Sequence, residues 1–191
     1  METTALDLPG LLLLKPRVFP DARGHFLEIF QDRRYPEFGV PGRFVQDNIS
    51  FSRRGVIRGL HYQLRHPQGK LVMPLTGEIW DVVLDIRRGS PTFGKWTAVS
   101  LKAEDCRQLY VPPGYAHGFA VVSDTALVLY KCTDYWHPGD EYGIIWDDPD
   151  LAIPWPVQTP LLSDKDRQFP SLEMAPPEHL PRYAVTGEDT P

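Results

Sequence analysis

Proline and glycine interrupt this chain too often for long helices. The sequence contains 20 prolines and 15 glycines among 191 residues, and a proline inside a helix removes a backbone hydrogen bond and clashes with the preceding turn. Between residues 45 and 146 the chain instead reads as short extended runs divided by turn residues. The clearest run covers residues 78–87, where apolar side chains recur at every second position from Trp80 to Ile86. We therefore predict an all-β fold, either a sandwich or a barrel.

Size and charge limit the number of domains and the classes of partner that we expect. A chain of 191 residues of which 42% are hydrophobic is sufficient for one domain with its own core. Its 25 acidic residues outnumber its 20 basic residues, whereas a general nucleic-acid binder carries a basic excess. The apolar run at residues 11–14 is too short for a membrane span or a signal peptide. We expect no nucleic-acid or membrane partner, a cytoplasmic location, and free thiols at Cys106 and Cys132.

The last part of the chain differs in composition from the rest. Four prolines fall between residues 149 and 160, and Ser163 is placed to cap a helical turn over residues 163–167. After Met174 apolar residues become sparse, so little of this segment is expected to dock. We predict a single domain over residues 1–174 and a loosely held, proline-rich tail over residues 175–191.

Three short segments carry more reactive side chains than the core of a β-protein normally holds. They are residues 58–63 with Arg58 and His61, residues 112–119 with His117, and residues 129–131 with Tyr130. The second segment has the Pro-x-Gly-x-x-His spacing of cupin barrels, in which a sharp turn starts a strand that directs its histidine into the barrel. A metal-binding cupin also needs an earlier His-x-His pair, but that place reads His61-Tyr62-Gln63. We therefore predict no metal ligands.

His61 stands out among the six histidines because of its neighbours. Arg58 precedes it by three residues, Lys70 follows it by nine, and an aspartate-rich segment lies downstream at residues 163–166. A base, a cation and an orienting carboxylate form a usable catalytic set. We take four other histidines, which lie in turn or tail contexts, as solvated: His25, His66, His137 and His179.

Two local irregularities are expected in the strands. Arg58 and His61 are three residues apart, so an ideal strand would direct them to opposite faces, and a bulge at Gly59 would bring them to the same face. Pro74 interrupts the strand that follows Lys70. This proline indicates either an edge strand or a bulge.

Short motifs recur in a fixed order along nearly the whole chain. They are DARGHFLE at residues 21–28, QDNIS at 46–50, GVIRGLHYQ at 55–63, GKLV at 69–72, DVVLDIR at 81–87, SPTFG at 90–94, PGYAHGF at 113–119, LYK at 129–131, DDP at 147–149, IPWP at 153–156 and LSDKD at 162–166. This set resembles the dTDP-4-dehydrorhamnose 3,5-epimerases over about residues 10–170. Because so many motifs occur in order, an accidental match is very improbable.

The resemblance implies a fold, a substrate and an assembly. The fold is a cupin-type double-stranded β-helix, or jelly-roll barrel, with short helical segments near the C-terminus. The substrate is a dTDP-4-keto-6-deoxyhexose, which the family converts without a metal or other cofactor. The assembly is a homodimer with exchange of N-terminal strands between the chains.

The resemblance also implies roles for individual residues. His61 matches the general base, Asp166 its orienting carboxylate, Lys70 the group at the keto oxygen and Tyr130 the acid on the other face of the sugar. Eight further residues match positions that line the sugar or nucleotide site: Arg23, Phe26, Glu28, Gln46, Asn48, Arg58, His117 and Tyr135. By composition alone Asp164 is as good a partner for His61 as Asp166.

The chemistry of such a sugar fits this set of groups. Carbons 3 and 5 both flank the C4 ketone, so loss of either C–H proton gives an enolate that can be reprotonated from the opposite face. A neutral imidazole held by a carboxylate supplies the base, and a cation stabilises charge on the keto oxygen. A phenol supplies the acid. Converging arginines, with Arg23, Arg58 and Arg65 as candidates, would bind the diphosphate despite the acidic chain.

Three alternatives remain open at the level of sequence. An epimerase restricted to C3 or to C5 would carry the same groups, because the stereochemical outcome depends on sub-ångström placement of the sugar. A non-catalytic sugar-binding cupin would need the arginines and aromatic residues but not His61 or Lys70. A metal-dependent cupin oxygenase or isomerase would contain stoichiometric iron, zinc or manganese.

Overall fold

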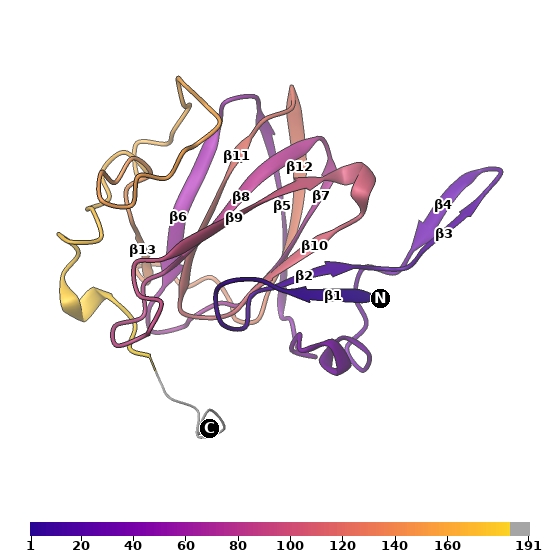
Figure 1. The fold of residues 1–191 in the computed structure, drawn as a ribbon, viewed down its shortest axis with the longest axis horizontal. Coiled ribbons are helices and arrows are strands. Elements are labelled where there is room, and N and C mark those ends of the chain that lie inside the picture. Colours follow the sequence, from indigo (N-terminus) through magenta and orange to yellow (C-terminus); the bar gives the residue numbers. More distant parts are fainter. Residues whose placement is uncertain (184–191) are drawn as a thin grey trace.

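The computed structural model describes residues 1–183 and confirms the all-β prediction. Two antiparallel sheets lie face to face and form the body of the molecule, as expected for a jelly-roll barrel (Figure 1). The first sheet has the order β1 (Glu2–Ala5), β2 (Leu12–Lys15), β10 (Gln108–Val111), β7 (Lys70–Thr76), β12 (Thr125–Cys132) and β5 (Gln46–Arg53). The second has the order β13 (Glu141–Gly143), β6 (Ile57–Gln63), β11 (Tyr115–Val121), β8 (Glu78–Asp85) and β9 (Trp96–Lys102).

Helical structure is confined to short 3-10 turns within residues 1–183. These are Tyr35–Phe38, Ala103–Asp105 and Pro177–His179. The expected turn near residue 163 is present, because the Arg167 N–H donates to the Ser163 carbonyl at 3.3 Å and the Asp166 N–H donates to the Ser163 hydroxyl at 3.1 Å. None of the helices in this part of the chain has the length and hydropathy that crossing a bilayer requires.

The period-two pattern of β8 divides its side chains between two cores. Ile79 and Val83 point into the barrel, where they pack with residues of the opposite sheet such as Val128. Val82 and Leu84 point to the other side, into an outer cluster that also contains Leu60, Ile144 and Leu180. Because both faces of β8 are covered, both sets of side chains are buried.

The proline-rich C-terminal segment covers the outer cluster, contrary to the expectation of a loosely held arm after Met174. Ala175 and Leu180 are 6% and 7% exposed. The Tyr62 hydroxyl donates to the His179 carbonyl at 3.0 Å, and the Arg88 N–H donates to the Pro181 carbonyl at 2.8 Å. A single buried leucine and a few backbone hydrogen bonds are enough to dock a segment whose composition is mostly polar and proline-rich. The expectation for residues 184–191 lies outside the described residues.

Both predicted strand irregularities are bulges. In β6 and β11, Arg58 pairs with Phe119 and His61 pairs with His117. Three residues of β6 therefore span the same stretch as two residues of β11. Pro74 lies at a register shift between β7 and β12, and β7 is an interior strand, which excludes the edge alternative. The Gly59 bulge turns Arg58 and His61 to the same side.

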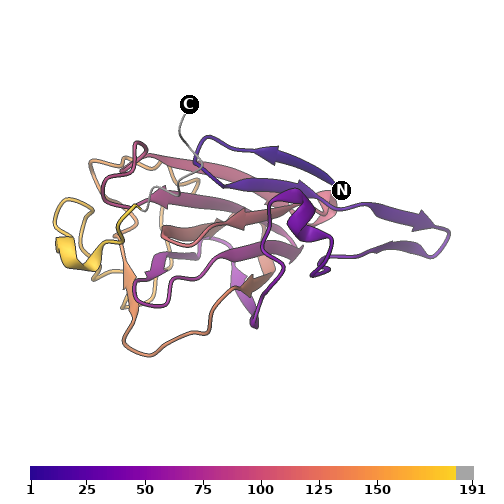
Figure 2. The ribbon, with the colours of Figure 1, turned by 90° about the horizontal axis from the view of Figure 1, so that it is seen from below.

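A hairpin near the N-terminus stands away from the body. Its strands, β3 (Val18–Asp21) and β4 (Gly24–Leu27), pair only with each other and project beyond the sheets (Figures 1 and 2). Phe19 and Phe26 are 45% and 68% exposed on it. An isolated two-stranded hairpin is marginally stable in water. Burial of these two rings against another surface would stabilise it.

We expect Leu180→Ala to lower the free energy of unfolding by about 2 kcal/mol, because it removes buried methyl groups from the outer cluster. Urea denaturation of the full chain measures this. The control is Met174→Ala, which truncates a side chain that is 74% exposed six positions earlier and should leave stability nearly unchanged. Equal stability of the two variants would contradict the docking of residues 175–183.

Candidate active site

A cavity of about 340 Å³ lies between the two sheets. Strands β5, β7 and β12 of one sheet and β6, β11 and β13 of the other contribute lining side chains. Three of the residues predicted to be catalytic line it, namely His61, Lys70 and Tyr130, and so do four of the predicted binding residues, namely Gln46, Asn48, Arg58 and His117. A larger surface hollow of about 760 Å³ contains none of the predicted residues.

His61 is held by a buried carboxylate. Its Nε2 lies 2.8 Å from Asp166 Oδ1, and Asp166 is 3% exposed. Burial by itself raises the pKa of Asp166, but hydrogen bonds from His61, Ser163 and the Gly59 N–H outweigh it and hold that pKa below its usual value. Asp166, rather than the exposed Asp164, is therefore the partner of His61, which resolves the alternative that composition left open.

Lys70 and Tyr130 face this imidazole from the opposite sheet. They lie on the neighbouring strands β7 and β12, where Lys70 pairs with Cys132 and Tyr130 pairs with Val72. Burial lowers the pKa of Lys70, an effect that Cys132, Glu141 and Asp81 oppose. Burial raises the pKa of Tyr130. Burial disfavours the charged form of each side chain, as expected in a cavity with little water, whereas the neighbouring acidic groups favour the ammonium form of Lys70.

A second imidazole and carboxylate pair lies beside the first. His117 is directly opposite His61 in the pairing of β11 with β6. Its Nε2 lies 2.8 Å and 3.0 Å from the two carboxylate oxygens of Asp81, a fully buried residue on β8. We did not single out Asp81 from the sequence as a site residue. The available signal was a charged residue between two apolar, barrel-facing residues of the strand, Ile79 and Val83.

Polar groups of β5 and β6 line the rest of the cavity. Arg58 donates from Nε to Ser52 Oγ at 2.9 Å and makes no ion pair with any described residue. Gln46 donates to Asn48 Oδ1 at 2.9 Å. The Ser50 hydroxyl is buried and has no hydrogen-bond partner among residues 1–183. A buried hydroxyl without a partner is costly, so a polar ligand would stabilise this face.

The cavity also contains residues that the sequence did not indicate. Glu141 Oε1 lies 3.9 Å from His61 Nδ1 and 2.8 Å from Lys165 Nζ. Burial raises the pKa of Glu141, but Lys165 and His61 more than compensate and hold it below its usual value. Trp136 lines the cavity where Tyr135 was expected. Tyr135 is 56% exposed and does not line the cavity.

Three predicted residues lie apart from the cavity within this chain. Arg23, Phe26 and Glu28 belong to the projecting hairpin and its end, and none of them lines the cavity. Arg23 pairs with Asp21, and Glu28 pairs with Arg34. The single chain therefore brings together the residues of the barrel and leaves those of the hairpin outside.

Gly59→Ala is expected to reduce stability by several kcal/mol and to disrupt the cavity. A Cβ at Gly59 would lie 2.6 Å from Gly118 Cα and 2.7 Å from the His117 oxygen, at a φ of +118°. Gly89→Ala is the matched control, because its φ is also positive, at +86°, but nothing lies within 4 Å of the added Cβ. Backbone strain alone should cost it about 1–2 kcal/mol. Chemical denaturation of both variants measures the difference, and similar losses would contradict the role of close backbone contact.

Comparison with known proteins supports the resemblance found in the sequence. The family model described as dTDP-4-dehydrorhamnose 3,5-epimerase matches residues 5–174. A protein of that name from Pseudomonas aeruginosa is 55% identical over 170 residues, which cover 88% of this chain and 94% of the relative.

Solved structures share the fold over nearly the whole chain. The dTDP-6-deoxy-D-glucose-3,5-epimerase of Legionella pneumophila, in complex with dTDP-4-keto-L-rhamnose, is 48% identical with a TM-score of 0.93 and covers 96% of this chain and 99% of its own. A 3′-monoepimerase of Streptomyces bikiniensis in complex with dTDP-quinovose is 36% identical with a TM-score of 0.88, over 93% and 92% of the two chains. With a family match over residues 5–174, 55% identity to a relative of that name and the same fold as the solved structures, this chain belongs to the dTDP-4-dehydrorhamnose 3,5-epimerase family.

Proposed function

We propose that this protein is an isomerase that epimerises a dTDP-4-keto-6-deoxyhexose at C3 and C5 in the biosynthesis of a deoxysugar of the rhamnose type. One observation carries the proposal. An imidazole with its carboxylate faces an ammonium group and a phenol across a cavity of about 340 Å³ between two sheets. Groups on opposite walls can act on opposite faces of one sugar ring, which inversion requires.

His61 acts as the base in this proposal. Asp166 is ionised because its pKa is held low, so it accepts a hydrogen bond and fixes the imidazole with its proton on Nε2. Nδ1 then carries the lone pair that removes a proton from C3 or C5. The C–H electron pair passes into the enolate, and the proton stays on the imidazole.

Lys70 stabilises the enolate oxygen. No carboxylate among the described residues lies within ion-pair distance of its ammonium group, so the charge is available to a ligand. A cation in a site with little water stabilises the developing oxyanion without reorganisation, and this is worth on the order of 10²–10³ in rate.

Tyr130 returns a proton from the far face. Because burial raises its pKa, the phenol keeps its proton near pH 7 until the carbanion is present. Donation to the carbon from the wall opposite His61 inverts the centre. The imidazolium and the phenolate then exchange protons with solvent, so the cycle transfers protons only.

One relative favours a second candidate. The S. bikiniensis structure, 36% identical with a TM-score of 0.88, is named as a 3′-monoepimerase, so the same fold serves an enzyme that acts at a single carbon. Action at C3 alone is therefore the alternative function for this chain. A purely sugar-binding role has less support, because binding alone does not require the His61 and Asp166 pair.

Heavy-water exchange separates these functions. During incubation of dTDP-4-keto-6-deoxyglucose with the enzyme in D₂O, we expect the proton signals of both C3 and C5 to disappear from the NMR spectrum. His61→Asn and Tyr130→Phe should reduce turnover by roughly 10²–10⁴ while binding of dTDP is retained. Tyr142→Phe, in the outer cluster, is the control and should turn over normally. Loss of the C3 signal alone would exclude action at C5, and no loss at all would exclude the epimerase.

We also propose that two copies of the chain form a homodimer in which each projecting hairpin reaches the cavity of the other chain. Three features support this. The hairpin pairs with no other strand, it exposes Phe19 and Phe26, and its Arg23 side chain is 90% exposed. Arg23 would add a further cation to the diphosphate site. The cytoplasmic location stays a prediction.

Subunit mixing tests the shared site. His61→Asn and a hairpin variant with Arg23→Ala and Phe26→Ala should each be inactive alone. After co-refolding, random pairing makes half of the dimers mixed, and each mixed dimer has one intact site, so about a quarter of the wild-type activity should return. If no activity returns, or if the hairpin variant is fully active alone, exchange of the hairpin is wrong.

A further inference from the structure

Three potential metal ligands converge on the surface outside the catalytic cavity. His66 lies in the connection between β6 and β7, and Asp134 and His137 lie in the connection between β12 and β13. One nitrogen of each ring and one carboxylate oxygen lie within 4.8 Å of one another. Asp134 Oδ2 is 3.8 Å from His66 Nδ1, and its Oδ1 is 3.9 Å from His137 Nε2.

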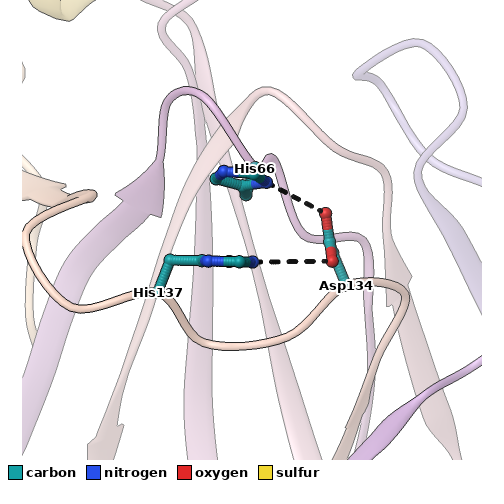
Figure 3. A group of neighbouring side chains, drawn as sticks. All are labelled: His66, Asp134 and His137. Carbon is teal, nitrogen blue, oxygen red and sulfur yellow. Dashed lines mark ion pairs between the residues drawn. The ribbon is translucent and has the colours of Figure 1, made fainter.

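The two imidazoles reach solvent, as the sequence suggested, and they also stack on each other. Their centroids are 3.7 Å apart and their planes differ by 16°. Figure 3 shows both rings with a nitrogen at the same edge, and Asp134 beside that edge. The three side chains thus present donor atoms to one small volume.

A single buried amide fixes both connections. Gln63, which is 5% exposed, donates from Nε2 to the carbonyl oxygens of His66 at 2.7 Å and Tyr135 at 3.0 Å. Its Oε1 accepts a hydrogen bond from the His137 N–H at 2.8 Å. The backbone positions of His66 and His137 are therefore determined by the same side chain.

Further hydrogen bonds fix the remaining backbone. The buried Asp140 carboxylate accepts the His66 N–H at 2.8 Å, while the Asp140 N–H donates to the His137 carbonyl at 3.2 Å. Gln68 donates to the Asp134 carbonyl at 2.9 Å. The side chains of His66, Asp134 and His137 remain 47%, 38% and 37% exposed. A fixed backbone with side chains free to turn is suited to holding an ion from solution.

The donor set matches a first-row divalent ion. Two imidazoles and one carboxylate are ligands of Zn²⁺ and its neighbours. At ligand distances of about 2.0–2.2 Å, the donor atoms of a tetrahedral site stand roughly 3.3–3.6 Å apart. One donor atom of each residue already lies within 4.8 Å of the others, so small side-chain rotations would bring the three to that spacing. The rings would leave the stack and turn their lone pairs to the ion, with water as the fourth ligand.

We propose that His66, Asp134 and His137 form a surface site for a divalent transition-metal ion. Zn²⁺ is the ion used to test it. The site is independent of the proposed catalytic groups. It would cross-link the two connections and fix the segment that carries Trp136, whose N–H donates to Gln46 Oε1 at 2.9 Å and whose side chain lines the catalytic cavity.

Calorimetric titration of the untagged, chelator-treated full chain with ZnCl₂ tests the site. We expect one equivalent to bind, with shifts of the His66 and His137 imidazole resonances in ¹H–¹⁵N spectra. His66→Asn and His137→Asn should each weaken binding at least about tenfold. Asp134→Asn should weaken it too, although its amide oxygen can still accept the Tyr135 N–H that now bonds to Asp134 Oδ1 at 2.7 Å.

Two controls keep the result interpretable. His25→Asn changes an exposed histidine on the projecting hairpin and should bind Zn²⁺ as the wild type does, and thermal unfolding without metal checks that every variant is folded. Saturating Zn²⁺ should raise the unfolding temperature of the wild type and not that of the His66 and His137 variants. The proposal is overturned if the wild type binds no stoichiometric Zn²⁺, or if binding survives in these variants and is lost only in His61→Asn.

Discussion

The close approach of two backbones at Gly59 and Gly118 is the constraint on which the site depends. A Cβ at either position would meet the other strand at 2.5–2.6 Å, so no side chain can stand between β6 and β11 there. At this contact β6 has one more residue than β11, which forms a bulge. The bulge turns Arg58 and His61 to the same side of the sheet. The Gly59 N–H also donates to Asp166. One bulge therefore aligns the imidazole, its carboxylate and a neighbouring cation.

In the described part of the chain, the cavity contains unpaired positive charge although the whole chain has a net charge of −5. Its carboxylates have cationic or imidazole partners: Asp166 and Asp81 each hold a histidine, and Glu141 pairs with Lys165. Lys70 and Arg58 line the same cavity, and neither forms an ion pair within residues 1–183. An acidic protein thus presents two uncompensated cations to a ligand, which suits a diphosphate sugar whose reaction develops negative charge.

The connections at the edges of the barrel have distinct physical roles. Residues 175–183 complete a core, because Leu180 fills the outer cluster that the second sheet would otherwise expose. The β3–β4 hairpin does the opposite, since it leaves Phe19 and Phe26 in solvent. The connections that follow β6 and β12 are fixed to each other through Gln63. These connections, rather than the strands, therefore determine which surfaces the chain offers to other molecules outside its cavity.

The sequence by itself determined the strands, the family and several of the residues that line the cavity, because period-two runs, turn residues and ordered motifs are local signals. It predicted the Gly59 bulge and the residues His61, Lys70 and Tyr130 of the cavity. It did not separate Asp166 from Asp164, did not single out Asp81 or Glu141, and selected Tyr135 instead of Trp136. It also gave no sign that His66 and His137 lie together. Those features depend on contacts between segments 36 to 105 residues apart, such as His117 with Asp81 and His61 with Asp166. Only the packing of the sheets decides which of several chemically equivalent side chains meet, because burial and register are properties of the assembled fold.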